Sequence, residues 1–171
     1  MPDIPYSHIV RVAELPSEGV AVHLEPDART LAELARHVDL IALHALAADL
    51  KVVPTAGDGA QVTGRLTAEV RQMSVVSLEP FDSRIEEEVD VLFMPESEAT
   101  AAPETEEGDP DYDPPDPLVD GNIDLGAIVT EFLALGIDPY PRRPGEVFEA
   151  PEEDEAAASP FAALARLKDK P

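Results

Sequence analysis

Apolar and polar residues alternate along three successive segments of the chain, 45–53, 61–76 and 83–94. A period of two gives a β-strand one apolar face and one polar face. The turns between these segments are short, which favours an antiparallel meander of half-buried strands. Two shorter segments, 7–14 and 20–24, predict a further hairpin around a turn that contains Pro and Gly. The residues expected to face the core are Leu46, Ala48, Leu50, Val52, Val62, Leu66, Ala68, Val70, Ile85, Val89, Val91 and Phe93.

Two other segments, 27–37 and 124–135, place apolar residues at helical spacing. Asp27 precedes the first, and its carboxylate can accept a backbone N–H that has no partner inside the helix. A capping box of Thr30 and Glu33 would instead start this helix three residues later.

The second helix has clear limits at both ends. Asp124 is a good N-cap, Gly136 stands at the C-cap position, and Pro139 prevents continuation. Its apolar face needs a cover, and the N-terminal half of the chain is the candidate.

These elements predict an α+β fold. About five strands form a strongly bent antiparallel sheet or an open barrel, packed with two or three helices and joined by long acidic loops. We expect one domain over residues 1–141, which contains an acidic mobile loop at 96–120. Residues 142–171 are expected to form an acidic linker, mobile over 144–158, and a short C-terminal helix over 159–170, which starts with Ser159 and Pro160.

Charge restricts the classes of partner. The chain of 171 residues has a formal net charge of −24, and residues 85–141 hold 17 of the 36 acidic residues and no Lys, Arg or His. Such a charge repels DNA, naked RNA and anionic membranes, and it favours basic partners. The absence of Cys excludes disulfides, and no segment resembles a signal peptide or a membrane span, so we expect a cytoplasmic protein.

Catalytic and cofactor motifs are absent from the sequence. The four His residues have no metal-binding spacing, and there is no phosphate-binding loop or nucleophile elbow. We therefore expect no cofactor, no metal and no enzymatic activity. A carboxylate pair of Glu87 and Glu131 in a small hydrolase is the weaker alternative.

Local basic and apolar clusters are the candidate contacts for RNA or for a protein partner. Arg65 and Arg71 share the outer face of one predicted strand, and Arg142 and Arg143 follow the second helix. The alternative is that these cations only neutralise nearby carboxylates. The predicted C-terminal helix adds Phe161, Leu164, Arg166 and Lys168.

Three stretches in this order resemble the YceD-type large ribosomal RNA subunit accumulation proteins of bacteria and plastids. They are VRQMSVVSLEPFDSRIEEEVDVLF at 70–93, IDLGAIVTEFLALGIDPYPRRPG at 123–145 and SPFAALARLKDK at 159–170. Many members of that family carry Cys-x-x-Cys where this chain has Ser74 and Ser77. A metal or redox role of that pair is therefore absent here.

The resemblance implies a non-catalytic role in large ribosomal subunit biogenesis, with large-subunit ribosomal RNA or a precursor particle as partner. It assigns no binding residues. The alternative is an acidic holding chaperone for a basic large-subunit ribosomal protein without direct RNA contact. The segment 159–170 is expected to dock either on this protein's own sheet or on the partner.

Overall fold

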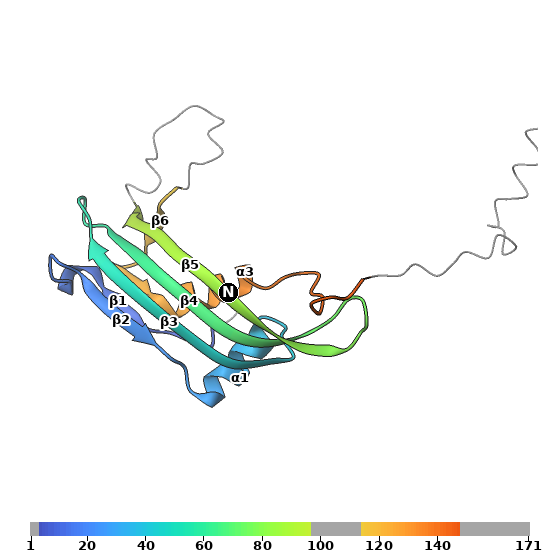
Figure 1. Cartoon of the computed structure of the whole chain (residues 1–171). Coiled ribbons are helices and arrows are strands. Elements are labelled where there is room, and N and C mark those ends of the chain that lie inside the picture. The colour runs from blue at the N-terminus through green and yellow to red at the C-terminus, as the bar shows by residue number, and fades with distance from the viewer. Residues whose placement is uncertain (1–3, 97–113, 148–171) are drawn as a thin grey trace, which may run out of the picture.

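The computed structural model describes residues 4–96 and 114–147, and its main element is a five-stranded sheet (Figure 1). The first four strands of the sheet run antiparallel, whereas the fifth, β6, runs parallel to β5. The predicted meander is thus confirmed, but the sheet is mixed and not wholly antiparallel. In spatial order the strands are β2 (Val20–Leu24), β3 (Ala42–Pro54), β4 (Ala60–Met73), β5 (Pro80–Pro95) and β6 (Asp116–Leu118).

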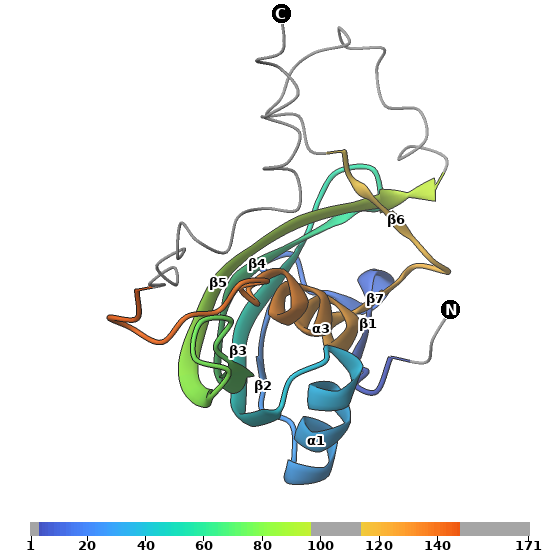
Figure 2. The same cartoon turned by 90° about the vertical axis from the view of Figure 1, so that its right-hand side faces the viewer.

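The sheet bends strongly around helix α3 (Leu125–Leu135), as Figure 2 shows. Gly64, in the middle of β4, permits a close approach of β4 to β3. A Cβ atom at this position would lie 2.1 Å from the carbonyl oxygen of Asp49 on β3. Within residues 4–96 and 114–147 the sheet does not close into a barrel.

The predicted N-terminal hairpin is wrong. Strand β1 (Ile9–Arg11) pairs antiparallel with β7 (Asn122–Asp124), and a 3₁₀ turn over Val12–Glu14 separates it from β2. The Asp124 carboxylate explains the pairing, because it accepts the Ser7 hydroxyl at 2.6 Å and the His8 N–H at 2.8 Å. Strand β1 thus pairs with a strand more than a hundred residues away in the sequence, and not with β2 as the hairpin requires.

Both predicted helices are present, with the predicted N-caps. Helix α1 (Ala28–His37) begins after Asp27, whose carboxylate accepts the Thr30 N–H at 2.8 Å, so the alternative capping box is not used. At α3, the Asp124 carboxylate accepts the Gly126 N–H at 3.0 Å. One aspartate therefore caps α3 and also holds β1 beside β7.

Gly136 occupies the predicted C-cap of α3, but for a different reason. Its φ of −75° is ordinary, so the position does not need the left-handed conformation that favours glycine. A Cβ atom here would instead lie 2.5 Å from Cγ2 of Ile85 on β5. The glycine lets the end of α3 approach the sheet.

Helix α3 lies on the concave face of the sheet and closes the core (Figure 2). The predicted inward-facing residues of β3 and β4 are all buried, as are Ile85 and Val89 of β5, whereas Val91 and Phe93 are half-buried. The helix contributes five large apolar side chains to the same core, so the N-terminal half does cover its apolar face. They are Leu125, Ile128, Val129, Leu133 and the half-buried Phe132.

One part of the predicted acidic loop at 96–120 is regular structure. Residues 116–118 form β6, and Leu118 is buried in the core. Residues 97–113 and the predicted C-terminal helix at 159–170 lie outside the described residues. The domain limits stay predictions, although Glu146, beyond the limit at 141, hydrogen-bonds to the domain. No helix within the described ranges is long and apolar enough to cross a membrane.

Candidate partner-binding surface

The connection between β4 and β5 lies against the segment that follows α3 (Figure 1). We call residues 73–80 and 138–147 together the tip. The backbone N–H of Val75 donates to the Pro141 carbonyl over 2.9 Å. Below them, the side-chain amide of the buried Gln72 donates to the Asp138 carbonyl over 3.4 Å. These contacts fix the segment after α3 to the end of the sheet.

Ser74 is the buried polar centre of the tip. Its hydroxyl donates to the Glu146 carboxylate, and its oxygen accepts the N–H groups of Val76 and Ser77 at 3.1 and 3.3 Å. The Arg143 N–H donates to the same carboxylate at 3.1 Å. The pKa of Glu146 is lowered mainly by the hydrogen bond from the Ser74 hydroxyl, and next by that from the Ser77 hydroxyl. The ionised carboxylate thus joins both segments of the tip.

Several large apolar side chains are exposed on the tip. Leu78 and Tyr140 are 75% and 70% exposed. Exposed apolar side chains that lie together mark contacts with other molecules, and the two segments that carry these side chains are in contact. The exposed apolar residues of the tip are Met73, Val75, Leu78, Tyr140 and Val147.

Two predicted contact residues, Arg142 and Arg143, lie on the tip. The Arg143 guanidinium bonds Glu79 at 3.0 Å and lies 3.9 Å from Glu146. Arg142 is exposed, and no carboxylate of the described residues pairs with it. The tip therefore presents one unpaired cation close in sequence to the exposed ring of Tyr140.

The other two predicted arginines lie on the outer, convex face of the sheet, as expected, but both are ion-paired. Arg71 binds the Asp82 carboxylate in two places, at 2.7 and 2.9 Å, and lowers the pKa of Asp82. His44 adds a contact of 3.2 Å to the same carboxylate. Arg65 lies 3.5 Å from Glu88. This geometry favours the alternative that these two cations neutralise neighbouring acids.

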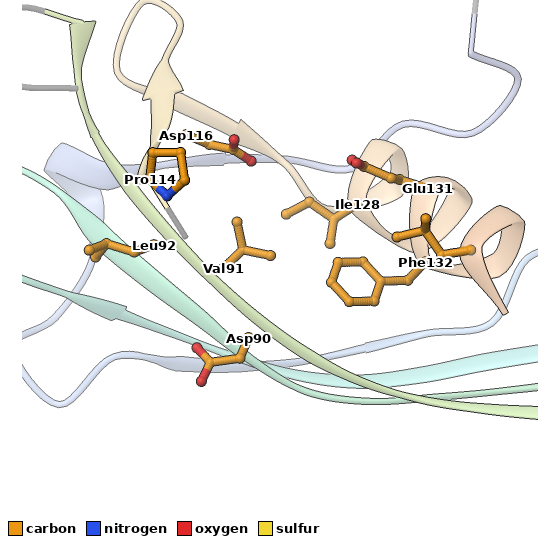
Figure 3. A pocket seen from close by; sticks show the side chains of 9 residues that line it. Asp90, Val91, Leu92, Pro114, Asp116, Ile128, Glu131 and Phe132 are labelled. Carbon is orange, nitrogen blue, oxygen red and sulfur yellow. The ribbon is translucent and has the colours of Figure 1, made fainter. Parts of the chain in front are cut away.

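A groove of about 520 Å³ separates β5 from α3 (Figure 3). Val91, Ile128 and Phe132 point into it and give it an apolar floor. The carboxylates of Asp116 and Glu131 lie at its mouth, and that of Glu131 points towards Asp116. The groove suits a ligand that is both apolar and cationic.

The comparison with known families decides the assignment. The model of the family described as "Large ribosomal RNA subunit accumulation protein YceD" matches residues 62–168. The chain belongs to the YceD family. The resemblance seen in the sequence is confirmed. No curated protein matches this chain, and no solved structure matches it.

The YceD match covers both the tip and the groove. It begins in β4, so α1 and the strands from β1 to β3 precede it. At the positions where many YceD proteins carry Cys-x-x-Cys, Ser74 and Ser77 bind a carboxylate of this chain. No group of three or more His, Cys, Asp or Glu suited to a metal ion is found in the part of the chain that the structure describes.

Sequence reasoning missed the residues that hold the tip together. In the sequence, Ser74 stands only as a residue in place of a cysteine, and Glu146 lies within the predicted acidic linker. The hydroxyl of Ser74 and the carboxylate of Glu146 are 72 positions apart in the sequence, and no local pattern joins them. The remaining predicted contacts, Phe161, Leu164, Arg166 and Lys168, lie outside the described residues.

Proposed function

We propose that the protein is a non-catalytic factor in large ribosomal subunit biogenesis, which acts on a precursor particle and contacts it through the tip. The observation that carries the proposal is the exposed ring of Tyr140 close in sequence to Arg142, which no carboxylate of the described residues pairs with. Aromatic rings stack on bases, and a guanidinium binds phosphate. The family's description provides the ribosomal context.

The tip is a better candidate for RNA contact than the outer face, because Arg142 is available to bind a phosphate. Binding of a phosphate by Arg71 would bring the phosphate beside the Asp82 carboxylate, which already accepts two of the guanidinium's hydrogen bonds. Arg65 would meet the same repulsion from Glu88. The described residues of the tip also include acids, but Glu79 and Glu146 both bind Arg143 and not Arg142.

The net charge of −24 limits the contact with RNA to a local one. Each phosphate neutralised adds roughly −0.7 to −0.9 to the slope of log K against log salt, so the few arginines of the tip give a shallow slope. We therefore expect the purified protein to bind naked RNA poorly at physiological salt. A particle offers basic proteins beside the RNA, and these attract the acidic surface.

A second candidate is an acidic holding chaperone for a basic large-subunit ribosomal protein, without RNA contact. The groove between β5 and α3 favours it, because the carboxylates of Asp116 and Glu131 stand above an apolar floor. A lysine- or arginine-rich peptide with apolar residues has the matching chemistry.

Neither candidate gives Glu87 or Glu131 a catalytic role, and no hydrogen bond joins these two carboxylates among the described residues.

Affinity purification of the tagged protein with and without ribonuclease separates the two candidates. If the protein acts on a precursor particle, large-subunit precursor RNA and several ribosomal proteins copurify, and ribonuclease releases them. If it is a chaperone, one basic protein stays bound after ribonuclease treatment. Copurification of neither would refute both candidates.

A further inference from the structure

The groove between β5 and α3 is an open part of the core. Its floor consists of side chains from both elements, and Figure 3 shows Val91 facing Ile128 and Phe132. Val91 and Phe132 are only half-buried, so apolar surface at the edge of the core stays accessible. A short segment with two apolar side chains would bury this surface and gain the corresponding hydrophobic free energy.

The mouth of the groove selects for positive charge. Asp116 and Glu131 place two carboxylates on one side of it, and the described residues that line it include no Lys, Arg or His. Asp90 also lines the groove, but its side chain points away. An occupant with cations directly after its apolar residues would match both parts of the groove.

The chain itself contains such a segment. Residues 159–170 read SPFAALARLKDK, in which Phe161 and Leu164 precede Arg166 and Lys168. All three cations after Arg143 lie in this segment, and six of the seven acidic residues after Arg143 precede it. Its composition therefore complements the groove in charge and in apolar content.

The tether is long enough to reach. Fourteen steps of the chain lead from Val147 to Phe161, and at about 3.3 Å per residue they span roughly 46 Å. Along β5, eleven steps lead from Pro80 at the tip to Val91 in the groove, or roughly 36 Å at the strand spacing. Residues 148–158 can thus connect the tip to the groove within one molecule.

We propose that residues 159–170 dock in the groove of the same molecule. Phe161 and Leu164 cover the apolar floor, and Arg166 and Lys168 lie beside the carboxylates of Glu131 and Asp116. The groove is then a peptide-binding site that the chain's own C-terminal segment covers. A basic peptide of a partner would have to displace this segment. The inference does not depend on the proposed function, because it concerns the purified protein alone.

A spin label on the whole chain of 171 residues tests the docking. The chain has no Cys, so Ala163→Cys gives a single labelling position, and in the predicted helix it lies opposite the edge of Phe161 and Leu164. We expect paramagnetic broadening of the methyl signals of Val91 and Ile128. No broadening in the groove, or broadening at the tip instead, would overturn the proposal.

Two matched charge reversals test the chemistry. Glu131→Lys on the labelled protein should abolish most of the broadening, because it repels Arg166 and Lys168. Glu69→Lys makes the same charge change on the exposed outer face of β4 and should leave the broadening unchanged. Equal effects of both variants would show general electrostatic attraction and would refute the specific site.

The occupant must also belong to the same molecule. In a mixture of spin-labelled protein and isotope-labelled protein without the spin label, we expect no broadening in the groove. Broadening there would identify a second copy as the occupant and refute the intramolecular proposal. As a further readout, Phe161→Ala with Leu164→Ala should remove the broadening in the labelled protein and lower its melting temperature. An unchanged broadening would overturn the roles given to these two side chains.

Discussion

The outer face of the sheet and the tip hold their arginines in different ways. On the outer face, Arg65 and Arg71 lie opposite Glu88 and Asp82 in the strand register, so each cation meets an acid. On the tip, a buried serine and an ionised carboxylate shape the backbone and leave Arg142 exposed. Exposed ion pairs contribute little free energy, whereas buried hydrogen bonds are costly to lose. Position, and not the number of arginines, therefore separates the two surfaces.

The largest expected effect is a loss of stability when the close packing of α3 against β5 is disturbed, just before the segment that forms the tip. Gly136→Val places a side chain where even a Cβ atom lies 2.5 Å from Ile85, so α3 must move away from β5. We expect a loss of about 3 kcal/mol in the free energy of unfolding, as for other overpacked cores. Leu135→Ala, at an exposed neighbouring position, is the control and should change it little. Denaturant unfolding measures both, and equal stabilities would refute the close packing at Gly136.

The next effect concerns the polar centre of the tip. Ser74→Ala removes the donor to Glu146 and the acceptor of two backbone N–H groups. We expect a loss of about 1.5 kcal/mol in the free energy of unfolding. Ser17→Ala, which removes an exposed hydroxyl bonded to the adjacent Glu18, is the matched control. Faster amide exchange confined to the tip should accompany the loss, and a stability equal to the control would refute the role of Ser74.

A smaller effect depends on pH. Because the folded pKa of Glu146 is below its ordinary value of 4.5, the ionised form stabilises the tip. This stabilisation is fully present above pH 4.5 and is lost as the pH falls through the folded pKa. An NMR titration of the Glu146 carboxyl carbon should show a midpoint below 4.5 in the native protein and a higher one in Ser74→Ala. Identical midpoints would contradict the hydrogen bond.

The smallest effect is expected on the outer face. Arg71→Gln breaks the pair with Asp82, so the pKa of Asp82 should rise towards its ordinary value. The melting temperature should change little, because both side chains are solvent-exposed and their attraction is screened. Carboxyl titration and thermal unfolding measure the two quantities. A large loss of stability would show that the outer face is held as firmly by its ion pairs as the tip is by its buried bonds.

The sequence correctly predicted the parts of the fold that depend on neighbouring residues, namely the strand faces and the helix starts. The alternation of β3, β4 and β5 gave the inward-facing residues, and Asp27 and Asp124 gave the helix starts. Strand β6 was not predicted because it is only three residues long and its sequence surroundings are rich in acids and prolines. Only Leu118 of this strand is buried in the core. The partner of β1 was not predicted either, since the contact of Ser7 with Asp124 joins distant parts of the chain.

The candidate site was predicted only in part. The cations Arg142 and Arg143 were identified as a cluster, but their pairing depends on Glu79 and Glu146, which the fold brings beside them. Arg71 was a candidate because it is a cation on the outer face of a predicted strand. The strand register places Asp82 opposite it, and this pairing was not predicted. A sequence reports which charges exist, whereas the fold decides which of them stay unpaired.

The most direct test of the central claim compares one cation from each surface. Arg142→Gln and Arg65→Gln each remove a single positive charge from an exposed side chain. Sucrose-gradient sedimentation of cell extracts measures the fraction of tagged protein that migrates with large-subunit precursors. We predict a several-fold smaller fraction for Arg142→Gln, an unchanged fraction for Arg65→Gln, and unchanged melting temperatures for both. Equal losses, or a loss only for Arg65→Gln, would contradict the claim that the tip and not the outer face contacts the particle.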